Sequence, residues 1–163
     1  MNQKRISFLL IAAGIVAAFG ILVLSLFYAP GVAEEALQAY QDVPGIRGLY
    51  RMGLSGVWVT AALFLLALAD YFRISVRIGK NRSFCAENVK SLKRIAVYIA
   101  VCAVLWAGAV FAPGLFFHIP IGPAWVFFLL FSMANAALSM LALGLSLLLS
   151  RVVEMQQEND LTV

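Results

Sequence analysis

The sequence predicts an all-α integral membrane protein, an antiparallel four-helix bundle with both termini in the cytoplasm. Three observations support this prediction. Hydrophobic residues make up 63% of the 163 residues and charged residues 12%, whereas soluble globular chains have about 45–50% and about 25%. Four long stretches carry almost no charge, and the basic residues gather on one side of the resulting topology. The composition excludes a soluble enzyme, a disordered chain and a disulfide-stabilised scaffold.

Each apolar stretch is long enough to cross the bilayer, because about 20 apolar residues span about 30 Å of hydrocarbon. The predicted spans are residues 6–29, 53–72, 95–117 and 124–150 of a single membrane domain, 1–163. They are separated by an outer loop at 30–52, a cytoplasmic loop at 73–94 and an outer hairpin at 118–123, and are followed by a cytoplasmic tail at 151–163. The first stretch exceeds the apolar core of a secretory signal, about 7–15 residues, and is expected to remain uncleaved.

The basic residues predict the orientation. Only Arg47 and Arg51 fall on the outer side. The other ten share the opposite side and are Lys4, Arg5, Arg73, Arg77, Lys80, Arg82, Lys90, Lys93, Arg94 and Arg151. Cytoplasmic loops carry the excess of Lys and Arg, so we expect both termini and the 73–94 loop in the cytoplasm of a bacterium, with the chain in its cytoplasmic (inner) membrane.

The outer loop contains a helical pattern. Ala33, Ala36, Leu37 and Tyr40 recur at the spacing of one helix face. The dipeptides Pro30-Gly31 and Pro44-Gly45 bracket this stretch. The pattern predicts a short, separate amphipathic helix that lies at the outer surface and caps the bundle.

Residue types that carry chemistry are scarce. Cys85 falls in the cytoplasmic loop and Cys102 in a span, so we expect no disulfide. The single histidine, His118, cannot form a metal site without further ligands. No nucleophile motif, zinc-protease motif or phosphate-binding glycine loop is present. We therefore expect no enzymatic activity, no cofactor and no metal.

Two polar residues lie within the predicted spans. Asp70 is about one turn from the cytoplasmic end of its helix, where a carboxylate opposes the helix dipole and needs a cation. Arg73 is its nearest candidate partner, and Arg77 lies two turns on. Asn135 shares a face with Ser132 and Ser139, a stripe that typically hydrogen-bonds a neighbouring helix. For both residues the alternatives are a structural role and a role in transport.

Two cytoplasmic segments stand apart from the spans. In the loop, Gly79 can end the second helix. Ser83 or Cys85 then precedes a new helix with Glu87 in its first turn, where the dipole favours a carboxylate. The tail at 154–163 is acidic and ends in Leu-Thr-Val. The tail either docks on the loop or ends as a frayed helix in water.

The loop and the tail resemble a bacterial family of small four-span membrane proteins known only as a domain of unknown function. The loop residues that carry the resemblance are Gly79, Lys80, Phe84, Glu87, Asn88, Leu92 and Ile95. Those of the tail are Glu158, Asn159, Asp160, Leu161 and Thr162. The chain departs from the pattern by one extra residue between Lys80 and Phe84, and by Cys85 where serine is usual, which weakens the helix cap because a thiol accepts hydrogen bonds weakly. The resemblance implies a regulatory membrane component that partners a helix-turn-helix repressor.

These patterns lead to a functional hypothesis. We expect a non-enzymatic, multi-pass regulatory, sensing or interaction protein whose cytoplasmic loop and tail contact a soluble partner, with no direct binding of nucleic acid. A homo-oligomer is compatible with the sequence. The first alternative is a small transporter, or a transporter subunit, that uses Asp70 and Asn135, and an unrecognised enzyme comes third.

Overall fold

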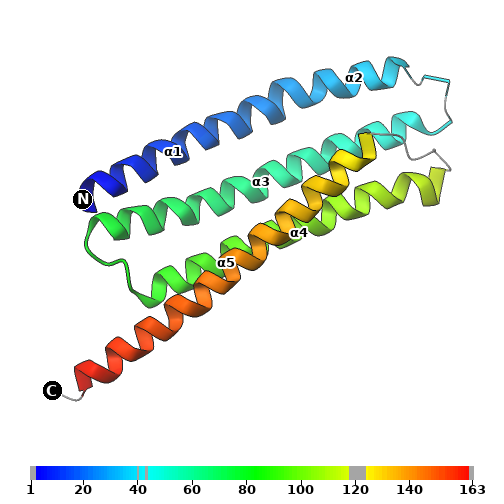
Figure 1. Ribbon diagram of the computed structural model, residues 1–163. Helices are drawn as coiled ribbons and strands as arrows, with labels where there is room; N and C mark the ends of the chain where they lie inside the picture. Colours follow the sequence, from blue (N-terminus) through cyan, green and yellow to red (C-terminus); the bar gives the residue numbers. More distant parts are fainter. Residues whose placement is uncertain (1–2, 40, 43, 118–123, 162–163) are drawn as a thin grey trace.

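The computed structural model describes the chain except residues 1–2, 40, 43, 118–123 and 162–163, and the described part is all-helical. The helices are α1 (Gln3–Val23), the π-helical turn η1 (Leu24–Tyr28), α2 (Ala29–Ala39), α3 (Ile46–Gly79), α4 (Ala86–Phe117) and α5 (Ala124–Leu161) (Figure 1). Within the described residues, four helical segments are long and apolar enough to cross a membrane: Gln3–Glu35, Ile46–Gly79, Ala86–Ala109 and Phe128–Asn159. The predicted all-α fold with four potential membrane-spanning helices is confirmed.

The helix predicted in the outer loop is present as α2, but it continues α1 and η1 as one rod (Figure 1), so its prediction as a helix lying at the outer surface apart from the first span is wrong. A proline inside a helix clashes with the carbonyl four residues back and usually breaks the helix. Before Pro30 the chain makes a wider π turn, in which the Ala29 N–H donates to the carbonyl of Leu24 five residues back. The carbonyl of Ser25, which an α-helix would have paired with Ala29, instead accepts a 3.3 Å hydrogen bond from Trp58 Nε1 on α3.

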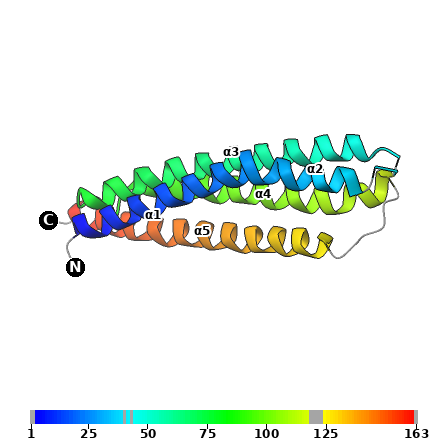
Figure 2. The ribbon, with the colours of Figure 1, turned by 90° about the horizontal axis from the view of Figure 1, so that it is seen from above.

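The helices pack in a row and do not close into a ring. Helix α1 packs on α3, α3 on α4 and α4 on α5, whereas no Cα atom of α5 lies within 8 Å of a Cα atom of α1 or α3 among the described residues. Figure 2 shows both termini at the same end of the bundle as the turn between α3 and α4. We refer to this end as the N/C end. Which side of the membrane it faces stays a prediction.

Small residues make the contacts between helices, whereas most large apolar side chains face outward. The buried apolar core consists of Ala67, Val89, Ala96, Cys102 and Ala103. This arrangement is typical of membrane helices, since lipid tails solvate large apolar side chains and close packing needs small ones. At the contact between α1 and α3, a Cβ on Gly14 would lie 2.6 Å from Cε1 of Phe72.

The helices extend beyond the apolar stretches of the sequence. Residues 73–79 and 86–94 are helical, as the predicted helix end at Gly79 and the predicted helix start after Ser83 or Cys85 require. Residues 46–52 of the predicted outer loop are helical as well, and the tail continues α5 as far as Leu161. Only residues 80–85 connect α3 to α4. Because an α-helix satisfies its own backbone hydrogen bonds, it can continue from hydrocarbon into water without interruption. The positions at which the chain enters and leaves the bilayer stay predictions.

Candidate functional site

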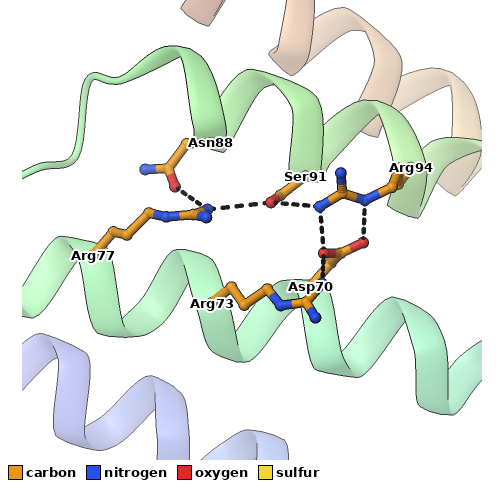
Figure 3. Close-up of polar contacts among 6 residues, drawn as sticks. All are labelled: Asp70, Arg73, Arg77, Asn88, Ser91 and Arg94. Atoms are coloured by element: carbon orange, nitrogen blue, oxygen red, sulfur yellow. Dashed lines mark hydrogen bonds and ion pairs between the residues drawn. The ribbon is translucent and has the colours of Figure 1, made fainter.

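Asp70 is the centre of a polar cluster between α3 and α4. It is only 2% exposed, and its carboxylate accepts three N–H bonds (Figure 3). Arg94 donates from Nε to Oδ2 and from Nη2 to Oδ1, each at 2.7 Å, while Arg73 donates from Nη1 to Oδ1 at 2.9 Å. The predicted pairing with Arg73 is confirmed. Arg77 makes no ion pair with Asp70 in the described structure, and the principal partner is Arg94 on the next helix.

Arg77 joins the same cluster through neutral groups. Its Nη1 donates to Oδ1 of Asn88 and to Oγ of Ser91, both at 3.2 Å. The Ser91 hydroxyl also accepts from Nη2 of Arg94 at 3.3 Å. A chain of hydrogen bonds therefore links three guanidinium groups and one carboxylate (Figure 3). We call this set the arginine cluster: Asp70, Arg73, Arg77, Asn88, Ser91 and Arg94.

Asn88 also closes the turn between the two helices. Its Nδ2 donates to the carbonyls of Arg82 at 3.2 Å and Ser83 at 2.9 Å, so the side-chain amide uses both its oxygen and its nitrogen. Asn88 is 1% exposed. A predicted interaction residue is therefore buried inside the protein, where a soluble partner cannot contact its side chain.

The end of α3 differs from the prediction in one respect. The helix does end at Gly79, but the left-handed residue is Asn81, with φ of 58°. Arg82 N–H donates to the Arg77 carbonyl and Asn81 N–H to the Ile78 carbonyl, the pattern of a Schellman motif. Asparagine is the usual alternative to glycine at this position.

Gly79 is instead required by helix packing. A Cβ on Gly79 would lie 2.7 Å from Oγ of Ser7 on α1. Ser7 donates from that oxygen to the carbonyl of Ser75 on α3 at 2.8 Å, and both serines are buried. The glycine thus allows α1 to approach the last turns of α3.

Helix α4 begins at Ala86, directly after Cys85, one of the two predicted starting positions. The Cys85 carbonyl accepts from the N–H groups of Asn88 and Val89, while its Sγ lies 3.4 Å from the carbonyl of Arg82. Around this turn Lys80 and Glu87 are exposed, as is Phe84 at 57%. These three predicted interaction residues reach the surface.

The tail contributes a helical surface at the same end. Glu158 and Asn159 are exposed in the last turns of α5. The side chains of Asp160 and Leu161, and all of Thr162, lie outside the described residues. Docking of the tail on the loop therefore stays a prediction.

Asn135 lies away from the arginine cluster, in the contact between α4 and α5. As predicted for this stripe, Ser132 donates to the Ala103 carbonyl and Ser139 to the Ala96 carbonyl, both at 2.8 Å. Asn135 itself donates to Phe131 on its own helix, and its buried Oδ1 has no partner among the described residues. The two predicted in-membrane polar residues, Asp70 and Asn135, therefore belong to different helix contacts.

An apolar groove of about 820 Å³ lies toward the opposite end of the bundle. It is bounded by the rod of α1, η1 and α2, by α3, and by the rings of Trp106, Phe128 and Phe131. No charged residue lines it, and the hydroxyls of Ser25 and Thr60 in its wall are bonded to carbonyls of their own helices. The groove depends on how the helices pack, so no local sequence signal marks it.

The sequence does contain a signal for Arg94 as the partner of Asp70. In a hairpin of two antiparallel helices, residues equally far from the turn lie at the same level. Asp70 lies twelve residues before position 82, and Arg94 lies twelve residues after it. A search along a single helix, by the i+3 and i+4 rule, cannot find this partner.

The fold and the cluster define a class, that of multi-pass membrane proteins with four spanning helices and a polar helical hairpin at one end. Residues 32–163 match the family described as "Protein of unknown function (DUF2975)", and the chain belongs to this family. It is 29% identical over 164 aligned residues, the full length of both proteins, to the "Uncharacterized membrane protein YoaS" of Bacillus subtilis (strain 168). No solved structure matches the chain.

Proposed function

We propose that this protein is a non-enzymatic component of a bacterial cytoplasmic membrane that acts by binding a soluble partner at its N/C end. The observation that carries the proposal is the construction of the turn between α3 and α4. Buried Asn88 bonds the turn at two carbonyls, whereas Lys80, Phe84 and Glu87 project from it. A turn that is fixed from within and exposes a phenylalanine and charges is suited to recognition.

Charge indicates the kind of partner surface. Arg73, Arg77 and Arg94 are engaged in the arginine cluster. Four further basic residues of the hairpin are exposed near its turn, namely Lys80, Arg82, Lys90 and Lys93. A partner with an acidic surface around an apolar pocket for Phe84 would complement this face, with electrostatics favouring fast association. A helix-turn-helix regulator is implied only by the family resemblance, and the exposed residues Glu158 and Asn159 would extend the surface along α5.

Site-directed photocrosslinking tests the proposal. A photoreactive amino acid at position 84, in cells that produce the full-length chain, should give adducts with a soluble protein that mass spectrometry identifies. The same amino acid at position 28, in the exposed Tyr28 at the opposite end, is the matched control. Truncation after Gln157 should weaken the adducts if the tail contributes. Adducts with lipid alone at position 84 would contradict the proposal.

Cysteine labelling tests the orientation on which this function depends. In a cysteine-free background, a cysteine at position 38 should react with an impermeant maleimide in intact cells. A cysteine at position 83 should react only after permeabilisation. Labelling of position 83 from outside would place the N/C end outside the cell and remove the basis for a cytoplasmic partner.

A small transporter, or a transporter subunit, is the second candidate, and the apolar groove favours it. The groove has the size of ligand sites, which are about 300–1,000 Å³. However, Asp70 is fully engaged with two arginines and Asn135 faces α4, so neither residue lines the groove. A substrate that enters it would have to be apolar. Export that is lost on Ala61→Trp, which fills the groove, would favour this candidate.

A further inference from the structure

The arginine cluster contains more positive charge than its own residues balance. Two ion pairs are present in the described structure, and both end on Asp70. The other acid of the hairpin, Glu87, is exposed and makes no ion pair within the described residues. Three guanidinium groups therefore share one carboxylate, which leaves two positive charges in excess.

The guanidinium groups lie close enough for one small anion to contact two of them. Nη1 of Arg77 and Nη2 of Arg94 bond the same Ser91 oxygen at 3.2 and 3.3 Å, so these nitrogens are at most about 6.5 Å apart. Nη1 of Arg73 and Nη2 of Arg94 likewise share Oδ1 of Asp70.

Arg77 keeps unused donors at this place. Its two bonds both come from Nη1, so its Nε and Nη2 have no partner among the described residues. Neither nitrogen is among the buried atoms without a partner, so both reach the surface. Arg73 and Arg94 are also accessible, with side chains 61% and 45% exposed.

From the sequence, we expect the arginine cluster at the level of the lipid headgroups. The apolar run of α3 ends at Ala69, directly before Asp70, and that of α4 begins at Ile95, directly after Arg94. These positions predict that the cluster lies where hydrocarbon gives way to the polar layer. Arginine side chains at this height extend toward the interface, where lipid phosphates are found.

We propose that the arginine cluster is a binding site for a phosphate group, supplied by the headgroup of an anionic phospholipid and held between Arg77 and Arg94. Guanidinium matches phosphate with paired N–H donors, whereas an ammonium acts as a point charge. Asp70 and Ser91 orient the two guanidinium groups before the phosphate arrives. The site does not depend on a soluble partner.

Native mass spectrometry of the full chain in mild detergent tests the site. Dioleoylphosphatidylglycerol is the anionic probe, and dioleoylphosphatidylcholine, which also has a phosphate but no net charge, is the comparison lipid. Arg77→Gln removes the unused donors and leaves the Asp70 pairs intact. Lys90→Gln removes the same charge from an exposed position at the same end, outside the cluster. Thermal melting of each variant confirms that it is folded.

We expect Arg77→Gln to weaken binding of phosphatidylglycerol at least about tenfold, the scale of one charge-assisted hydrogen bond, and Lys90→Gln to weaken it by at most about fivefold. Arg77→Lys should recover only part of the loss, because it restores the charge without the paired donors. Equal affinities in Arg77→Gln and the parent, or equal losses in Arg77→Gln and Lys90→Gln, would overturn the site. An Arg77-dependent rise in melting temperature with inorganic phosphate, without any preference for phosphatidylglycerol, would overturn the lipid as the source.

Discussion

Replacement of Arg94 by glutamine should destabilise the protein far more than the same replacement at Arg73. Both residues bond Asp70, which is 2% exposed, but Arg94 supplies two of the three N–H bonds and Arg73 only one. Removal of one partner of a buried ion pair costs about 3–5 kcal/mol because the remaining charge stays buried. Since Arg73 remains and the Arg94 side chain is 45% exposed, we take the lower end, about 3 kcal/mol.

The Arg73 side chain is 61% exposed, so its pair resembles a surface salt bridge and contributes about 0–1 kcal/mol. The assay is reversible unfolding in dodecyl maltoside micelles with increasing dodecyl sulfate, followed by circular dichroism. A double-mutant cycle with Asp70→Asn isolates each pair, and the coupling to Arg94 should exceed that to Arg73 by about 2 kcal/mol. Equal losses in Arg94→Gln and Arg73→Gln, or a smaller loss in Arg94→Gln, would refute the assignment of Arg94 as the principal partner.

Two further predictions concern the end of α3. Gly79→Ala should lower the melting temperature, because the new Cβ would lie 2.7 Å from Ser7 Oγ and overpacking of this kind costs about 1–3 kcal/mol. The double variant Ser7→Gly/Gly79→Ala should regain part of the lost stability. A melting temperature unchanged by Gly79→Ala would show that α1 can shift freely. Asn81→Gly should stabilise the protein by up to about 1 kcal/mol, because φ of 58° is strained for any residue with a Cβ. The same unfolding assay measures this change in the free energy of unfolding. Lys80→Gly is the matched control and should destabilise the protein, because Lys80 has φ of −93° and gains nothing from glycine.

The candidate site was predictable in part. Asp70 is conspicuous because a carboxylate at the edge of an apolar helix needs a cation, and Arg73 lies within reach on the same helix. Arg94 follows only once the hairpin and the position of its turn are known. Asn88 shows the limit of motif reasoning. The pattern that singles it out does not distinguish a residue that meets a partner from one that closes a turn, and only its burial decides between them.

Pro30 illustrates how a reliable local rule can fail. Proline followed by glycine normally interrupts a helix, so the pattern predicts a helix beyond Pro30 that is separate from the first span. The interruption is avoided by a π turn whose released carbonyl, that of Ser25, is bonded by Trp58 from another helix. A local rule cannot include this contribution, because the donor lies 33 residues away.

By itself, the sequence determined that the protein consists of apolar helices long enough to cross a membrane. Peptide groups in hydrocarbon must all be hydrogen-bonded, and a single long apolar run can satisfy its own peptide groups only as a helix. Only the tertiary structure decided which polar groups meet: Arg94 with Asp70, Trp58 with Ser25, and Ser7 with the space left by Gly79. Each successive residue turns the side chain by about 100° around the helix. The rotation and level of each helix, and with them these contacts, depend on packing against its neighbours rather than on its own sequence.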